Sequence, residues 1–127
     1  MPRASRSNKP ALIPAVGLDV VEISRIRDFA ERNPRFLTRI FSYDEIRYCR
    51  GKKLQWQHFA VRFAAKEAVW KALGRDGLSL KSIEIRRDRL GRPSVAIEGR
   101  AEPGIAISLS HGTNTAMAVA LASSELS

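Results

Sequence analysis

Two carboxylates and one lysine in this chain have types and spacings that suit chemistry on phosphates. Glu67 and Lys71 lie four residues apart in an Ala- and Lys-rich run without proline, so a helix would place them on one face, one turn apart. Asp19 directly follows the apolar run Val16-Gly17-Leu18. Mg²⁺ prefers oxygen ligands and commonly takes one or two carboxylates together with substrate phosphates. If Asp19 and Glu67 converge, the set predicts metal-assisted phosphate chemistry in which Lys71 contacts a phosphate oxygen or protonates a leaving group.

Each of these side chains also has a purely structural explanation. Asp19 could cap a helix that starts near Glu22, or simply be solvated. Glu67 followed by Lys71 is the favoured order for an exposed ion pair on a helix, which contributes only about 0.3–0.5 kcal/mol. His111 falls between a predicted strand and a turn, where it could bond to a backbone carbonyl and do nothing else. The chemical interpretation therefore depends on the convergence of the whole set.

Three neighbouring side chains receive simpler predictions. Lys66 is expected to face solvent or a phosphate, and His58, at the start of the long helix, is expected to lie on the surface. Cys49 is expected to be a half-buried filler, because no base is arranged to activate it.

The elements that position these residues follow from their periodicity. Residues 14–21 are apolar and β-branched, which predicts a buried strand. Residues 22–33 show apolar spacings of three and four, which predict a helix that ends before Pro34. The sequence Ser42-Tyr43-Asp44-Glu45 fits a capping box at the start of a helix that ends near Cys49.

A long helix from Trp56 to Leu73, ended by Gly74 as a C-cap, precedes a β-rich region. Strands are predicted at 83–85, 94–97, 105–109 and 116–122. The predicted fold is therefore α+β, with a long central helix and short helices packed on a small, mostly antiparallel sheet. Residues 1–12 are expected to be a disordered basic tail, and residues 13–127 a single domain.

Composition limits the classes of protein to which the chain can belong. With 127 residues, 44% of them hydrophobic and 28% charged, it suits an ordinary globular protein. No apolar run approaches the roughly 20 residues that cross a bilayer, and no segment has the order of a secretory signal. The single Cys49 excludes an intrachain disulfide and a multi-cysteine zinc site. We therefore expect a cytoplasmic location and no membrane span.

The net charge of +9 is concentrated in one part of the chain. Between Arg25 and Arg62 there are ten Lys or Arg residues and four Asp or Glu residues. Such a block predicts a basic face that attracts nucleic acid, anionic lipid, a polyphosphate ligand or an acidic protein, unless it is merely solvated.

The motifs around the candidate site carry a resemblance to a known family. Val16-Gly17-Leu18-Asp19 and the run from Phe63 to Ala72 are similar to the two motifs of holo-acyl-carrier-protein synthase, the small trimeric type of 4′-phosphopantetheinyl transferase. Further matches lie in order at 20–26, 83–93 and 107–111, so the likeness covers about residues 16–121.

The resemblance implies a reaction and roles for the motif residues. The phosphopantetheine arm of coenzyme A moves to a serine of apo acyl carrier protein, in fatty acid biosynthesis, and adenosine 3′,5′-bisphosphate leaves. Asp19 and Glu67 bind Mg²⁺, and Lys71 stabilises or protonates the departing phosphate. Arg62 contacts a coenzyme A phosphate, Gly91-Arg92-Pro93 forms a loop beside the nucleotide, and His111 lies in the coenzyme A pocket.

The resemblance also implies partners. Arg25 matches a position that contacts the acidic helix of acyl carrier protein, and Arg27 and Arg32 extend that patch. The family forms trimers with active sites between subunits, so Asp19 and His111 could serve a site together with the helix of another chain. The chain departs from the family pattern in two places: Gly74-Arg75-Asp76-Gly77 replaces Gly-Thr-Gly, and Trp70 is unusually bulky.

Two other functions stay open from the residues alone. A pI near 10.6 fits a nucleic-acid-binding module, although an aromatic stacking platform and a recognised reading motif are missing. A Mg²⁺-dependent phosphodiesterase could use the same carboxylates, although neither motif has a third acidic ligand beside it.

Overall fold

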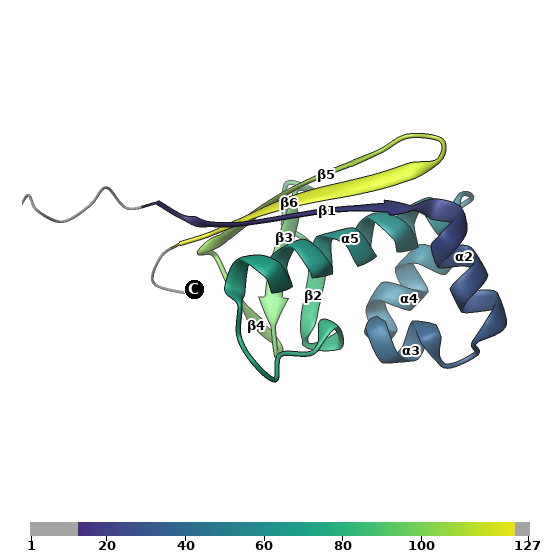
Figure 1. Ribbon diagram of the computed structural model, residues 1–127, viewed down its shortest axis with the longest axis horizontal. Helices are drawn as coiled ribbons and strands as arrows, with labels where there is room; N and C mark the ends of the chain where they lie inside the picture. Colours follow the sequence, from purple (N-terminus) through teal and green to yellow (C-terminus); the bar gives the residue numbers. More distant parts are fainter. Residues whose placement is uncertain (1–12, 124–127) are drawn as a thin grey trace, which may run out of the picture.

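The computed structural model describes residues 13–123, which are arranged around one long helix (Figure 1). The elements in order are β1 (Ala15–Glu22), α2 (Ile23–Arg32), α3 (Phe36–Ile40), α4 (Tyr43–Arg50), α5 (Gln55–Leu73), the 3₁₀ turn η1 (Leu80–Ser82), β2 (Ile83–Arg87), β3 (Pro93–Ile97), β4 (Arg100–Ala101), β5 (Ile105–His111) and β6 (Thr115–Ala122). The predicted basic tail, residues 1–12, lies outside the described residues. Among residues 13–123, no helix has both the length and the apolar character needed to cross a membrane.

Two antiparallel sheets share the long helix. The first has the strand order β1-β6-β5, and the second has the order β2-β3-β4. Figure 1 shows α5 running along the first sheet, while α2, α3 and α4 gather beside its amino-terminal half. The predicted α+β fold with a long central helix is therefore confirmed.

Small residues allow α5 to lie very close to the first sheet. Ala64, Ala68 and Ala72 are buried on α5, and Gly17 faces them from β1. A Cβ atom placed on Gly17 would lie 1.8 Å from the carbonyl oxygen of Ala68, so only glycine allows this approach of backbone to backbone. The helix ends as predicted at Gly74, which has a φ of 60°.

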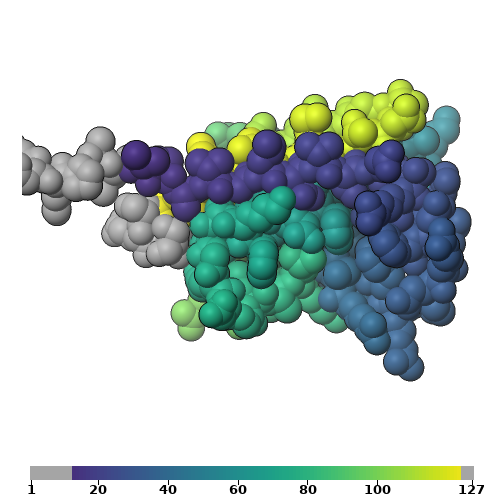
Figure 2. Space-filling view, in the orientation of Figure 1, coloured from purple at the N-terminus to yellow at the C-terminus, as the bar shows by residue number. Residues whose placement is uncertain are grey.

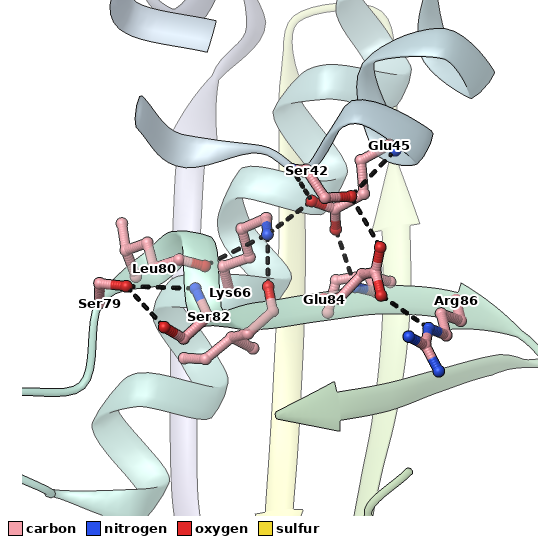
Figure 3. Close-up of polar contacts among 10 residues, drawn as sticks. Ser42, Glu45, Lys66, Ser79, Leu80, Ser82, Glu84 and Arg86 are labelled. Atoms are coloured by element: carbon pink, nitrogen blue, oxygen red, sulfur yellow. Dashed lines mark hydrogen bonds and ion pairs between the residues drawn. The ribbon is translucent and has the colours of Figure 1, made fainter. Parts of the chain in front are cut away.

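The predicted capping box is present at α4, and it extends into a buried ion pair (Figure 3). Ser42 Oγ accepts a hydrogen bond from the Glu45 amide, and the Ser42 amide donates to Glu45 Oε1. Lys66 Nζ lies 2.7 Å from the same Glu45 Oε1 and donates to the carbonyl oxygens of Leu80 and Ile83. Both side chains are almost fully buried, so the prediction that Lys66 faces solvent or a phosphate is wrong. Lys66 instead ties α5 to α4 and to the start of β2.

The first sheet has an apolar outer face that α5 does not cover. Val16, Leu18 and Val20 on β1 are each 57% exposed, and the register pairs them with Leu121, Val119 and Met117 on β6. Figure 2 shows β1, in purple, running across the surface of the molecule. The prediction of a buried strand is therefore wrong for these alternate residues, because β1 packs only its other face on α5. Cys49, predicted to be half-buried, is fully buried.

The replacement Lys66→Met tests the buried pair. We expect the free energy of unfolding to fall by about 3–5 kcal/mol, because Glu45 would remain buried without its cation. Urea unfolding followed by circular dichroism measures this loss, and Lys81→Met, at an exposed lysine of η1, is the control. The double variant Glu45→Gln, Lys66→Met should lose less than the sum of the single variants. If Lys66→Met lost no more stability than Lys81→Met, the buried ion pair would not hold α4 and α5 together.

Candidate active site

The fold brings Asp19, Glu67 and Lys71 together on one side of α5. Asp19 lies on the inner face of β1, two residues after Gly17, where its side chain is 17% exposed. Lys71 Nζ lies 3.1 Å from Asp19 Oδ1 and also donates to the carbonyl oxygen of Leu18 at 2.9 Å. These three residues, called the Asp19 cluster below, come from β1 and α5, which are more than 30 residues apart in sequence and meet within one chain.

The observed contacts rule out the purely structural explanations for Asp19 and for the pair Glu67 and Lys71. The N-cap of α2 is Glu22, which makes no side-chain capping bond, and Asp19 lies inside the preceding strand. Lys71 pairs with Asp19 across the two elements, and no ion pair between Lys71 and Glu67 is present in the described part of the chain. Both simple alternatives, the cap and the exposed i, i+4 pair, are therefore excluded.

The electrostatics of the Asp19 cluster favour a bound cation. Partial burial raises the pKa of Glu67, the nearby Asp19 carboxylate raises it further, and the Lys71 ammonium only partly opposes these effects. Two neighbouring carboxylates at a partly buried position fit Mg²⁺, which is commonly bound by one or two carboxylates together with substrate phosphates. Within residues 13–123 no group of three or more His, Cys, Asp or Glu residues could hold a metal, so the remaining ligands would be water and phosphate oxygens.

A hollow of about 390 Å³ opens beside the Asp19 cluster. Its walls include Arg25 of α2 and three aromatic rings, those of Phe29, Phe36 and Phe63. The Arg25 guanidinium lies 5.6 Å from the centre of the Phe29 ring. The sequence interpretation missed these rings, although Phe63 precedes Glu67 by four residues and therefore shares its helical face.

A second, larger hollow of about 1010 Å³ is lined by most of the residues expected to contact coenzyme A. Gly91 is not part of its lining, and Lys71 lines the hollow beside Asp19 instead. Its lining includes Arg92, Pro93 and four residues called the Arg62 cluster below: His58, Arg62, Arg87 and His111. The rings of His58 and His111 lie 6.4 Å apart, and Arg62 is only 4% exposed.

The loop after β2 forms one wall of this hollow. Gly91 has a φ of 81° in the turn that presents Arg92 and Pro93. Arg92 is already paired with Asp88, at 3.0 Å, whereas the Arg62 and Arg87 side chains have no ion pair within residues 13–123.

His58, predicted to lie on the surface, is partly exposed there and also belongs to this site. Its side chain is partly buried and lines the larger hollow. Burial lowers the pKa of His58, and the positive charges of Arg62 and Lys52 lower it further. Both effects favour the neutral form of the imidazole. His58 therefore adds no positive charge to that of Arg62 and Lys52. The signal available in the sequence was its position four residues before Arg62, on the same helical face.

The two clusters lie on opposite sides of α5. At about 100° per residue, helix positions 58 and 62 point away from positions 67 and 71. A single chain therefore carries both halves of the expected site without joining them in one cavity. Asp19 contacts the α5 of its own chain, so it does not need the helix of another chain.

Comparison with known proteins identifies the family of this chain. The family model described as the 4′-phosphopantetheinyl transferase superfamily matches residues 15–122. The chain belongs to this superfamily. The transferase chain is 47% identical over 120 residues to the holo-[acyl-carrier-protein] synthase of Geotalea daltonii, covering 85% of this chain and 96% of that protein. It is 40% identical to the enzyme of the same name from Clostridium acetobutylicum, covering 87% and 97% of the two chains.

Solved structures with the same fold carry related names. A crystal structure of a holo-(acyl-carrier-protein) synthase from Bacillus anthracis, in complex with CoA (3′,5′-ADP), superposes with a TM-score of 0.75 at 30% identity, covering 90% of the transferase chain and 99% of that chain. The Helicobacter pylori holo-[acyl-carrier-protein] synthase in complex with coenzyme A gives 0.72 at 30% identity, covering 85% and 99%.

The basic residues of α2 in this transferase-family chain lie beside the Asp19 cluster. Arg25, Arg27 and Arg32 are exposed, and Arg27 contacts Asp28 at 3.5 Å. Arg25 lines the hollow next to Asp19, and together with Arg32 it lines a shallower one on the outer side of α2. The predicted basic face therefore borders the carboxylates.

The variant Gly17→Ala tests how the Asp19 cluster is assembled. The added methyl group would collide with the Ala68 carbonyl, so β1 must move away from α5 and carry Asp19 from Glu67 and Lys71. We expect a stability loss of about 1–3 kcal/mol and a smaller increase in melting temperature on adding Mg²⁺. Differential scanning calorimetry with and without Mg²⁺ measures both.

Gly112→Ala is the matched control, because a Cβ there meets no atom within 4 Å. An unchanged response of Gly17→Ala to Mg²⁺ would show that the close approach does not set the site.

Proposed function

We propose that this chain is a holo-acyl-carrier-protein synthase: it transfers the 4′-phosphopantetheine arm of coenzyme A to a serine of apo acyl carrier protein and releases adenosine 3′,5′-bisphosphate. The convergence of Asp19, Glu67 and Lys71 supports this activity, because the superfamily match spans the elements that bring these residues together. The relatives at 40–47% identity carry that enzyme name over nearly their whole length. A cytoplasmic location would agree with this role.

Each member of the Asp19 cluster has a role in this transfer. Asp19 and Glu67 would hold Mg²⁺, which when bound supplies positive charge to the pyrophosphate of coenzyme A. Lys71 is fixed by Asp19 and by the Leu18 carbonyl, so its ammonium group is already oriented before the substrate reacts. The serine hydroxyl oxygen forms a new bond to phosphorus and gives its proton to water or to a nearby carboxylate. The P–O bond to the adenosine bisphosphate breaks, and Lys71 donates a hydrogen bond or a proton to the oxygen of the leaving phosphate.

The carrier protein would approach along α2. Arg25 presents positive charge in the hollow beside the carboxylates, and Arg27 and Arg32 are exposed on the same helix. An acidic helix bound along α2 would place the target serine near Asp19. Such charges act mainly on encounter rate and orientation.

A homotrimer would join the two halves of the site. The Asp19 cluster and the Arg62 cluster point in opposite directions on α5, so the arm of one coenzyme A molecule would reach from the Arg62 cluster of one subunit to the Asp19 cluster of the next. The apolar outer face of β1 and β6 supports association, since Val16, Leu18 and Val20 are exposed to solvent in a single chain. Identical head-to-tail contacts among three copies would close into a ring.

The experiment that tests the function combines the purified chain, apo acyl carrier protein, coenzyme A and Mg²⁺. Mass spectrometry should detect one added phosphopantetheine on the carrier, and Asp19→Asn should lower the rate on the order of 10²-fold or more. Asp76→Asn, at an exposed carboxylate of the loop after α5, is the matched control and should keep the rate. No added mass, while a known transferase works in parallel, would refute the proposal.

Subunit complementation tests the shared site. Asp19→Asn and Arg62→Leu should each be nearly inactive alone. After both are unfolded, mixed and refolded together, about a quarter of the interfaces in random mixed rings would carry neither change. Transfer activity should then reappear. Activity that stays at the level of the separate variants would place the whole site within one subunit.

A further inference from the structure

Tyr48, in the last turn of α4, is surrounded by positive charge. The Arg62 guanidinium carbon lies 4.2 Å from the centre of its ring, Lys52 Nζ lies at 4.5 Å, and the Arg87 guanidinium carbon lies at 5.8 Å. Arg87 Nε also donates a hydrogen bond to the Tyr48 hydroxyl at 3.2 Å. One aromatic side chain therefore contacts three cations from three segments of the chain.

These cations lack carboxylate partners. Within residues 13–123, Lys52, Arg62 and Arg87 form no ion pair, while the neighbouring Arg86 and Arg92 pair with Glu84 and Asp88. Arg62 is 4% exposed, so water cannot solvate most of its guanidinium. A desolvated cation–π contact contributes about 2 kcal/mol, which offsets only part of the cost of gathering like charges in a partly buried place. Such an arrangement is expected where an anion binds.

Two neutral groups respond to this positive potential. Burial alone would raise the pKa of Tyr48, but the hydrogen bond from Arg87 and the charges of Arg87, Arg62 and Lys52 lower it overall. The pKa of His58, which borders the same charges, is lowered as well. Arg62, Arg87 and His58 all line the larger hollow, so these unpaired cations face the space expected to hold the nucleotide. On their other side, Arg62 and Arg87 share a smaller hollow with the carboxylates of Asp44, Glu45 and Glu84, none of which forms an ion pair with either arginine within residues 13–123.

We propose that Tyr48 is a positioning residue for the donor: its ring seats Arg62 and Lys52, and its hydroxyl orients Arg87, so that Arg62 and Arg87 present their charges to one phosphate of coenzyme A in the larger hollow. Lys52, on the same ring, adds positive charge beside them. This inference rests on the proposed transferase function and deepens it. Arg87 also donates to the Gly91 carbonyl at 2.7 Å, which fixes a second edge of its guanidinium. A neutral tyrosine suits this task better than a carboxylate would, because it holds cations without cancelling the charge that the phosphate needs.

The first test separates donor binding from chemistry. Tyr48→Phe should release Arg87 alone and raise the KM for coenzyme A and the Kd for adenosine 3′,5′-bisphosphate about threefold, while Tyr48→Leu should raise both about tenfold or more. The kcat should change less than twofold, roughly, because the Asp19 cluster lies on the other side of α5. Transfer kinetics give KM and kcat, and calorimetry gives Kd.

Tyr43→Leu is the matched control, since Tyr43 lies on the same helix, is 73% exposed and, among the cations of residues 13–123, contacts only Arg47, at 5.8 Å. It should leave KM and Kd unchanged. Unchanged KM and Kd in a folded Tyr48→Leu protein would overturn the proposal.

A second test does not depend on the folding of Tyr48 variants. The chain has two tyrosines, so in Tyr43→Phe the ultraviolet absorbance of phenolate reports Tyr48 alone. Adenosine 3′,5′-bisphosphate should raise the pKa of Tyr48, because its phosphate neutralises the surrounding cations; an unmoved pKa at saturating ligand would overturn the proposal. Failure of the function itself has a different signature, namely a wild-type protein that transfers no arm to the carrier.

Discussion

The close approach of β1 to α5 at Gly17 is the constraint on which the rest of this structure depends. Because Gly17 has no Cβ, the strand lies directly against the carbonyl of Ala68. Side chains alternate along a strand, so Asp19, two residues later, faces the same helix and reaches Lys71 at 3.1 Å. A larger residue at Gly17 would separate the two elements that bring the carboxylates together.

The other side of α5 is fixed by a different contact. Glu45 and Lys66 form a buried ion pair between α4 and α5, and Tyr48 and Arg62 stack one turn away along the same two helices. The ion pair therefore also sets the register of the cation–π contact. Removing either partner would affect both the stability of the chain and the position of the cations that face the larger hollow.

Local sequence signals were sufficient for most of the fold. The capping box at Ser42, the C-cap at Gly74 and the β-rich second half were all predicted, since each depends on neighbouring residues. The buried state of Lys66 was not predicted, because it depends on Glu45, which is far away in sequence and only becomes a neighbour in the folded chain. The cations around Tyr48 were missed for the same reason.

The outer face of β1 shows a different limit of prediction. Apolar residues normally predict burial, and Val16, Leu18 and Val20 gave no local sign that they face outward. Of the candidate site, the convergence of Asp19, Glu67 and Lys71 was predicted from motif order. The separation of that cluster from Arg62 and His111 within one chain was not predicted from the residues. The sequence does not show which elements pack on each face of α5, and these elements decide where the two clusters lie.

The alternation of β1 has an evolutionary consequence. Odd-numbered positions such as Gly17 and Asp19 face the catalytic helix, while even-numbered positions such as Leu18 face outward, where the proposed neighbouring subunit would sit. An insertion or deletion of one residue in this strand would exchange the two sets, turning valines toward the ion site and a carboxylate toward the interface. Substitutions can therefore change either face of β1 separately. Insertions or deletions of one residue in the strand before Asp19 would change both faces at once and should be selected against.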